Sequence, residues 1–158
     1  MQAQDWHQVC SIYVEGIATG LATFETEAPD WPSWDSSHLT SCRLVARTDG
    51  SVIGWAALSP VSSRCVYGDV AEVSVYVSAA TRGKGVGKKL LDALVAESER
   101  NGIWTLQAGI LTDNSPSIAL HKACGFRVVG VRERLGKLRD VWRDVVVMER
   151  RSGIVGKE

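Results

Sequence analysis

Several features that would mark particular classes of protein are missing from this chain of 158 residues. The longest apolar runs are far short of the ~18 residues that a membrane span requires. The N-terminus has no basic segment followed by an apolar one, so no secretory signal is expected. Eighteen basic and eighteen acidic residues give a formal net charge of zero, so no global field favours nucleic acid or an anionic membrane. We therefore expect a cytoplasmic protein that has neither of these partners.

Cysteine is scarce, and its spacing argues against two further classes. Cys10, Cys42, Cys65 and Cys124 lie far apart, without a C-x-x-C pair or a nearby histidine cluster. Neither a zinc site nor a disulfide scaffold is indicated. We expect free, mostly buried thiols and no metal.

The chain also lacks internal repeats and low-complexity tracts. Its length suits one domain that can bury a continuous core without disulfides or metal. We expect this domain to cover residues 1–151, with a disordered tail over residues 152–158.

Hydrophobic periodicity and turn signals predict an alternation of helices and strands. Apolar residues at helical spacing follow Asp5, a candidate N-cap, and Thr48-Asp49-Gly50 is a turn between two β-prone runs. The expected order is helix, short helix, hairpin, strand, helix, strand, helix and two strands, over residues 5–19, 33–41, 43–47 with 51–59, 70–77, 86–101, 103–111, 115–124, 126–135 and 141–148. This pattern predicts an α/β fold with a mixed sheet.

The most informative motif is Arg82-Gly83-Lys84-Gly85-Val86-Gly87, which connects a predicted strand to a predicted helix. Its glycines let the backbone pass close to a ligand, and the helix start offers unpaired N–H groups and a positive dipole end. We therefore expect an anionic cofactor at this loop. The glycine spacing fits neither the dinucleotide fingerprint nor the Walker loop, because both need other glycine positions.

Together with this loop, four further motifs resemble those of the GNAT superfamily of N-acetyltransferases, most closely the phosphinothricin and methionine sulfoximine acetyltransferases. They are Tyr13-Val14-Glu15-Gly16-Ile17, Thr23-Phe24-Glu25-Thr26, Ala71-Glu72-Val73-Ser74-Val75-Tyr76-Val77, and Asn114-Ser115-Pro116-Ser117 with Leu120-His121-Lys122-Ala123-Cys124-Gly125-Phe126. The resemblance implies a three-layer fold with a twisted, mostly antiparallel sheet between helices. The family usually opens with a strand before the first helix. Here the first helix is expected to begin within about five residues of Met1, so we expect this strand to be missing.

The resemblance implies acetyl-CoA as co-substrate. Strand 73–77 would pair with the pantetheine arm, and the N–H groups of residues 83–88 would hold the pyrophosphate. The implied cofactor-binding residues are Val75, Tyr76, Val77, Arg82, Gly83, Lys84, Gly85, Val86, Gly87, Lys88, Asn114 and Ser117.

Acetyl transfer to an amine needs a neutral nucleophile, although an alkylamine is protonated near neutral pH. The family pattern assigns Glu72 as the general base, and strand alternation aims it to the same face as Ser74 and Tyr76. His121 occupies the position of an acid or proton relay for the departing thiolate. A packed or capped histidine is the alternative for His121, and a surface carboxylate is the alternative for Glu72.

The implied acceptor is a small amino-acid-like amine of the phosphinothricin, methionine sulfoximine or methionine sulfone type, which attacks the thioester directly. The candidate substrate-binding residues are Phe24, Glu25, Arg64 and Tyr76. The Arg64 guanidinium is expected to form a bidentate hydrogen bond with an acceptor carboxylate or phosphinate. A solvent-exposed loop arginine is the alternative for Arg64. Another amine acceptor (an arylalkylamine, a polyamine or a protein N-terminus) or a non-catalytic CoA-binding module remains open. Relatives commonly pair, so we also expect a homodimer.

Overall fold

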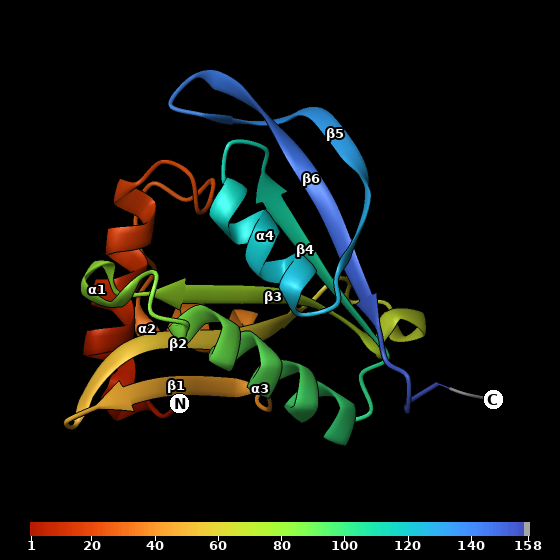
Figure 1. Cartoon of the computed structure of the whole chain (residues 1–158), viewed down its shortest axis with the longest axis horizontal. Coiled ribbons are helices and arrows are strands. Elements are labelled where there is room, and N and C mark those ends of the chain that lie inside the picture. The colour runs from red at the N-terminus through yellow and green to blue at the C-terminus, as the bar shows by residue number, and fades with distance from the viewer. Residues whose placement is uncertain (157–158) are drawn as a thin grey trace.

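A twisted sheet of six strands runs through the centre of the molecule, as Figure 1 shows. The computed structural model describes residues 1–156. The strands are β1 (Arg43–Thr48), β2 (Ser51–Pro60), β3 (Val70–Val77), β4 (Thr105–Leu111), β5 (Arg127–Leu138) and β6 (Val141–Arg151). They lie in the order β1-β2-β3-β4-β6-β5, and only β3 and β4 are parallel neighbours. The predicted mixed, mostly antiparallel sheet is confirmed.

The parallel neighbours separate soon after they meet. β3 and β4 pair from Val70 with Thr105 to Glu72 with Gln107, and no further. Beyond Glu72 the two strands diverge and leave a wedge in the middle of the sheet (Figure 1). The edge of β3 that faces this wedge has backbone groups without a strand partner, and such groups are available to a ligand.

Helices cover both faces of the sheet. Alternating side chains of β2 point to opposite faces and pack against different helices. Ala56 and Leu58 pack in one core with α3 (Val86–Arg100), whereas Trp55 and Ala57 pack in a second core with α1 (Trp6–Ala18). The short α2 (Trp31–Ser37) joins the second core through Trp34, and α4 (Ser115–Ala123) joins the first through Ile118 and Leu120. The arrangement is the predicted three-layer fold.

The predicted short helix over residues 33–41 was wrong at both ends, because α2 covers Trp31–Ser37. The Asp30 carboxylate accepts a hydrogen bond from the Ser33 N–H at 2.9 Å, so Asp30 is the N-cap. Pro32 lies in the first turn, where a missing N–H costs nothing. This proline therefore belongs to the helix and not to the loop before it.

The N-terminal cap also differs from the prediction. Asp5 precedes α1, but its side chain does not cap that helix. Its carboxylate accepts from the Gln2 N–H at 2.8 Å and pairs with Arg47 of β1. Within residues 1–156 no strand precedes α1, as predicted. The Met1 ammonium instead donates to the Arg43 carbonyl at the start of β1, at 2.8 Å.

The predicted tail begins with an ordered residue. Ser152 is buried, its N–H donates to the Trp104 carbonyl at 2.8 Å, and its hydroxyl donates to Glu99 at 3.0 Å. Residues 157–158 of the expected tail lie outside the described residues. In the described part of the chain, no helix is both long and apolar enough to cross a membrane.

Candidate active site

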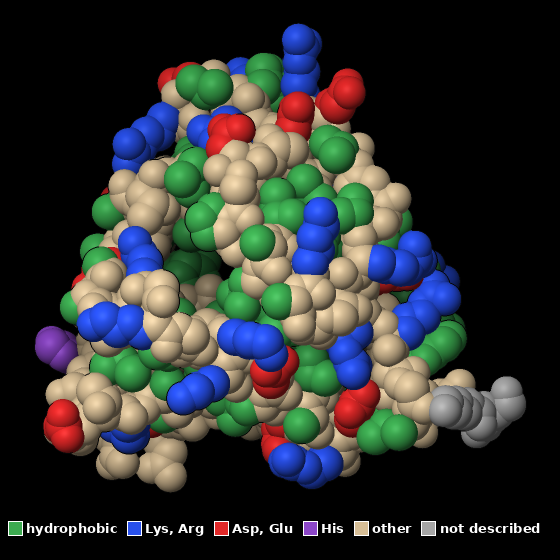
Figure 2. Space-filling model, viewed as in Figure 1, with side chains coloured by type: hydrophobic (Ala, Val, Ile, Leu, Met, Phe, Trp, Pro, Cys, Tyr) green, Lys and Arg blue, Asp and Glu red, His purple; other side chains and the backbone are tan. Residues whose placement is uncertain are grey.

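Two adjoining cavities follow the free edge of β3. The first, which we call the Glu72 cavity, has a volume of about 340 Å³, and the second, the loop cavity, has a volume of about 520 Å³. Both are lined by Leu21, Ala22, Val75, Tyr76, Asn114 and Ser117. In Figure 2 the molecule is hollowed between α1 and α4, above β3, with apolar side chains in the depth and Lys and Arg side chains around the rim. A ligand in one cavity would therefore meet a ligand in the other.

The glycine-rich loop forms the far end of the loop cavity. Gly83 and Gly85 have φ angles of +76° and +81°, in the left-handed region that favours glycine. Gly85 is the N-cap of α3, and no side chain caps this helix start. Its first N–H groups are therefore free to bind an anion, and the helix dipole adds positive potential there.

The cations near this loop have partners of their own. Lys88 pairs with Asp92 at 2.6 Å, Lys84 donates to the Ala80 carbonyl at 3.0 Å, and Arg82 donates to the Val77 carbonyl at 3.1 Å. The hydrogen bonds of all three are exposed. Of the twelve cofactor-binding residues that we predicted, eleven line the loop cavity and Lys84 does not.

Tyr76 forms the wall between the two cavities, and its neighbours fix its ring tightly. The ring stacks on Trp55, with the two centroids 4.7 Å apart, and meets Tyr13 edge to face at 4.9 Å. A Cβ atom at Gly16 of α1 would lie 2.7 Å from two carbons of the ring, so only glycine leaves the space that the ring fills. Burial raises the pKa of the Tyr76 phenol, which therefore stays protonated at neutral pH.

Glu72 lies at the fork where β3 and β4 separate. One carboxylate oxygen accepts a hydrogen bond from the side-chain amide of Gln107, its partner on β4, at 3.1 Å. Ser74 and Tyr76 line the same cavity, as the predicted alternation requires. The side chain is half-buried, so the carboxylate is held in place and still reaches the cavity.

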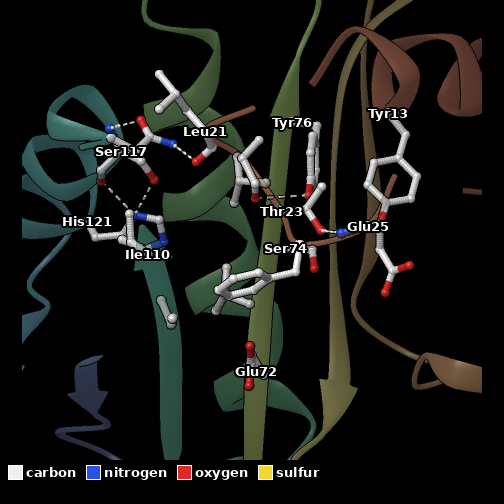
Figure 3. A pocket seen from close by; sticks show the side chains of 17 residues that line it. Tyr13, Leu21, Thr23, Glu25, Glu72, Ser74, Tyr76, Ile110, Ser117 and His121 are labelled. Atoms are coloured by element: carbon white, nitrogen blue, oxygen red, sulfur yellow. Dashed lines mark hydrogen bonds between the residues drawn. The ribbon is translucent and has the colours of Figure 1, made fainter. Parts of the chain in front are cut away.

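His121 lies across the cavity from the tyrosines, on α4 (Figure 3). Its Nδ1 is 2.8 Å from the Ser117 carbonyl oxygen, and since a carbonyl only accepts, Nδ1 carries the hydrogen. Burial lowers the pKa of the imidazole, although the Ser117 bond partly opposes this effect. The ring is therefore neutral at pH 7, with its lone pair on Nε2. This Nε2 is buried and has no hydrogen-bond partner in residues 1–156, and His121 is one of the residues that line the Glu72 cavity.

Asn114 connects the two sides of the site. It is the N-cap of α4, where its side-chain oxygen accepts from the Ser117 N–H at 3.2 Å. Its side-chain amide also donates to the Leu21 carbonyl at 3.1 Å. The segment after α1 is thereby tied to the start of α4, across the mouth of the wedge.

The predicted acceptor residues divide into two groups. Phe24, Glu25 and Tyr76 line the Glu72 cavity, and Glu25 is exposed. Arg64 lines neither cavity: it lies exposed in the loop before β3, with its guanidinium 5.7 Å from the centre of the Tyr67 ring. Among the described residues that line the Glu72 cavity, Glu25 and Glu72 are acidic and none is Lys or Arg.

The structure adds residues that the sequence patterns did not assign to the site. Tyr13, Leu21, Ser74 and Gly109 line the Glu72 cavity, and Gln107 holds Glu72 from behind. The strand alternation that predicted the orientation of Glu72 also predicted that Ser74 lies on the same face. Gln107 had no such signal, because its pairing with Glu72 depends on a strand register that spans 35 residues.

The cysteines take no part in either cavity among the described residues. Cys42 and Cys124 are buried, Cys10 is half-buried and Cys65 is exposed, and all four are free. Burial raises the pKa of the Cys124 thiol to about 11. A thiol with this pKa is a poor nucleophile at neutral pH.

Comparison with known proteins agrees with this geometry. The model of the acetyltransferase (GNAT) family matches residues 5–126. A phosphinothricin N-acetyltransferase of Alcaligenes faecalis is 34% identical over 157 residues, which cover 92% of this chain and 77% of that protein. An L-methionine sulfoximine/L-methionine sulfone acetyltransferase of Salmonella typhimurium is 37% identical over 106 residues, which cover 67% of this chain and 62% of the relative.

A solved structure extends the likeness to the whole fold. The phosphinothricin acetyltransferase of Sinorhizobium meliloti, in complex with acetyl-CoA, superposes with a TM-score of 0.91 at 33% identity, covering 100% of this chain and 89% of the other. The family match and the superposition both cover the strand, loop and helix that line the two cavities. The chain therefore belongs to the GNAT family of acetyltransferases.

Proposed function

We propose that this protein transfers an acetyl group from acetyl-CoA to the α-amine of a small amino-acid-like acceptor. The observation that carries the proposal is the junction of the two cavities. A cavity that holds Glu72 and the neutral His121 adjoins a second one that ends at the glycine-rich loop. The relatives named above act on phosphinothricin and on methionine sulfoximine or sulfone, which supports an acceptor of this size and type.

The loop cavity fits acetyl-CoA on two independent features. The uncapped start of α3, behind the left-handed Gly83 and Gly85, suits a pyrophosphate. The edge of β3 at Val75 and Val77 has no strand partner on the β4 side, and it suits the amides of a pantetheine arm. When bound, acetyl-CoA supplies the thioester from which the acetyl group is taken.

Glu72 is the group best placed to remove the proton of the acceptor ammonium. Its carboxylate lies at the fork of β3 and β4, and the bond from Gln107 fixes one of its oxygens. The other oxygen remains for the acceptor. General-base action by such a group contributes roughly a hundredfold or more to a rate.

His121 is a proton acceptor in its resting state. Its hydrogen sits on Nδ1, toward the Ser117 carbonyl, so the free Nε2 can take a proton and cannot give one. It becomes an acid only after it has received a proton from the site. We propose that it acts as a relay, which is one of the two roles implied by the family resemblance.

An acceptor carboxylate needs a cation that the Glu72 cavity of one chain does not provide. Arg64 lies outside the cavity of its own chain, and its loop is exposed from Ser63 to Asp69. The edge strand β5 and its neighbour β6 expose a group of large apolar side chains, Val128, Val129, Val131, Leu135, Val141 and Trp142. We propose that this surface pairs with a second copy of the chain, and that Arg64 binds the acceptor of the partner subunit.

An acceptor screen with detection of the released thiol tests the proposed reaction. The panel contains phosphinothricin, methionine sulfoximine, methionine sulfone and common amino acids, together with an arylalkylamine, a polyamine and an N-terminal peptide. Turnover of the amino-acid-like compounds supports the proposal. Glu72→Gln should then reduce kcat by roughly a hundredfold or more and leave acetyl-CoA affinity unchanged. A Glu72→Gln enzyme with normal turnover at every pH would exclude Glu72 as the base.

Mixed dimers test the role of Arg64. Arg64→Ala and Glu72→Gln chains are each expected to be nearly inactive alone. If Arg64 acts on the partner's cavity, co-expression restores activity, because one cavity of each mixed dimer then has both groups. If activity does not return, or if light scattering finds a monomer, Arg64 does not act across a dimer.

A second acceptor class is favoured by one observation. The Glu72 cavity has two carboxylates and no Lys or Arg among its described lining residues, and such a cavity suits an amine without an acidic group. An arylalkylamine or polyamine that turns over faster than methionine sulfone would establish this alternative and remove the need for Arg64.

A further inference from the structure

The β5–β6 hairpin reaches back to the segment that follows α1. Leu111 of β4, Leu138 of β5 and Val145 of β6 form a small buried cluster, and Phe24 packs against it. The turn after β4 is tied to the same hairpin, because Arg143 donates to Asp113 at 2.8 Å and the Thr112 N–H donates to the Asp144 carbonyl at 3.1 Å. Phe24 also lines the Glu72 cavity. One ring therefore contacts the hairpin on one side and the cavity on the other.

Gly136 of β5 lies directly against this ring. A Cβ atom at Gly136 would lie 3.0, 3.2 and 3.3 Å from Cε1, Cζ and Cδ1 of Phe24, three neighbouring atoms of one ring edge. These distances are shorter than ordinary van der Waals contact, so any side chain at this position has to move the ring. The φ angle of Gly136 is not in the left-handed region. Glycine is needed here for the space that the ring fills and not for the backbone.

Gly130 supplies a matched comparison on the same strand. It is half-buried like Gly136, its φ angle is also outside the left-handed region, and a Cβ atom there would meet nothing within 4 Å. The two glycines differ in one respect, which is the contact with Phe24.

We propose that Gly136 is a specificity-determining position that acts through Phe24, an inference that rests on the proposed function of the Glu72 cavity. Leu111, Leu138 and Val145 are buried and occupy the hairpin side of the ring, so the cavity is the direction in which the ring can move. The absence of a side chain at Gly136 keeps the ring withdrawn and the cavity deep. Gly136 is a positioning residue, since it acts on the acceptor only by way of Phe24.

The test compares Gly136→Ala with Gly130→Ala. In Gly136→Ala the KM for methionine sulfone should rise on the order of tenfold, the effect of about one methylene group in an apolar pocket. The KM for a small acceptor such as alanine should change much less. The dissociation constant of acetyl-CoA, measured by calorimetry without acceptor, should be the same in both variants and in the unmodified protein.

Removal of the ring provides a second arm. In a Phe24→Leu background the Gly136→Ala change should no longer alter the KM for methionine sulfone, because Cε1 and Cζ, the two atoms nearest to the new methyl group, are gone. This arm compares Phe24→Leu with Phe24→Leu/Gly136→Ala, so it remains informative if Gly136→Ala alone fails to fold.

Failure of the proposed function and failure of the role of Gly136 give different results. If the unmodified protein acetylates no amino-acid-like acceptor, the proposed function fails and this inference fails with it. If the protein is active but Gly136→Ala and Gly130→Ala have the same acceptor KM, only the role of Gly136 is wrong. A Gly136→Ala effect of the same size in the Phe24→Leu background would also overturn it, because the effect would then not pass through the ring.

Discussion

Gly85→Ala is the change that most directly tests the anion site. Gly85 caps α3 with a φ angle of +81°, and a methyl group there would meet nothing within 4 Å. Replacing Gly85 with alanine therefore strains the backbone and causes no steric clash. A non-glycine residue in the left-handed region loses roughly 1–2 kcal/mol, either as lost stability or as a relaxed loop that turns its N–H groups away from the ligand.

Gly50→Ala is a control with the same strain. Gly50 lies in the turn between β1 and β2 with a φ angle of +79°, a methyl group there would also meet nothing within 4 Å, and the residue lines neither cavity. Both variants should lose roughly 1–2 kcal/mol of unfolding free energy in urea. Only Gly85→Ala should weaken acetyl-CoA binding. Each charge-assisted hydrogen bond contributes about 1.5–3 kcal/mol, so the loss of one such bond raises the dissociation constant roughly tenfold or more.

Calorimetric titration of acetyl-CoA in the absence of acceptor measures this difference. Turnover is not needed, so the result does not depend on which amine is the true acceptor. Equal affinities in Gly85→Ala and Gly50→Ala would mean that the N-terminus of α3 does not hold the pyrophosphate. The loop geometry would then not identify the anion site, whatever the family membership.

Three further changes test other parts of the structure. Gly16→Ala should lower the unfolding free energy by about 2 kcal/mol, because its Cβ atom would lie 2.7 Å from the Tyr76 ring. Thermal unfolding measures this, with Gly153→Ala, where nothing lies within 4 Å, as the control. Burial lowers the pKa of His121, so the unfolded chain binds more protons than the folded one below about pH 6.5. The unmodified protein should therefore lose stability relative to His121→Gln as the pH falls from about 8 to about 5 (urea unfolding), and a constant difference would contradict the neutral ring. Arg43→Met should cost about 1–3 kcal/mol of unfolding free energy, because the Arg43 side chain is 9% exposed and donates to the Asp35 and His38 carbonyls, each at 2.9 Å, which would lose this donor. Arg100→Met, at a pair whose arginine is 69% exposed, should cost less than about 0.5 kcal/mol.

The elements that the sequence predicted best have strong local signals. β3 begins and ends at the predicted residues, and α3 and α4 begin at the predicted residues 86 and 115. α2 was misplaced because Pro32 reads equally well as a loop residue or as part of a first helical turn, and only the bond from Ser33 to Asp30 decides between them.

The parts of the site that could not be predicted depend on contacts between distant segments. Glu72 was assigned from its motif, but its fixation by Gln107 follows from the parallel register of β3 and β4. The neutral state of His121 follows from burial, the position of its hydrogen on Nδ1 follows from the bond to Ser117, and a sequence pattern reports neither. The position of Arg64 outside the cavity has the same cause, since the path of its loop is not encoded in any local spacing.

The glycines of this chain also divide into those that a local motif explains and those that a contact with a distant segment explains. Gly83 and Gly85 are required by their backbone angles, and a strand–loop–helix motif makes such positions readable from sequence. Gly16 and Gly136 are required because an aromatic ring from a distant segment, Tyr76 or Phe24, occupies the space of a side chain. The first kind shapes the loop before α3, which is the proposed anion site. The second kind leaves room for Tyr76 and Phe24, which line the Glu72 cavity. A substitution at Gly136, outside the quoted motifs, can therefore change the proposed acceptor choice while the loop that is proposed to hold the donor stays the same.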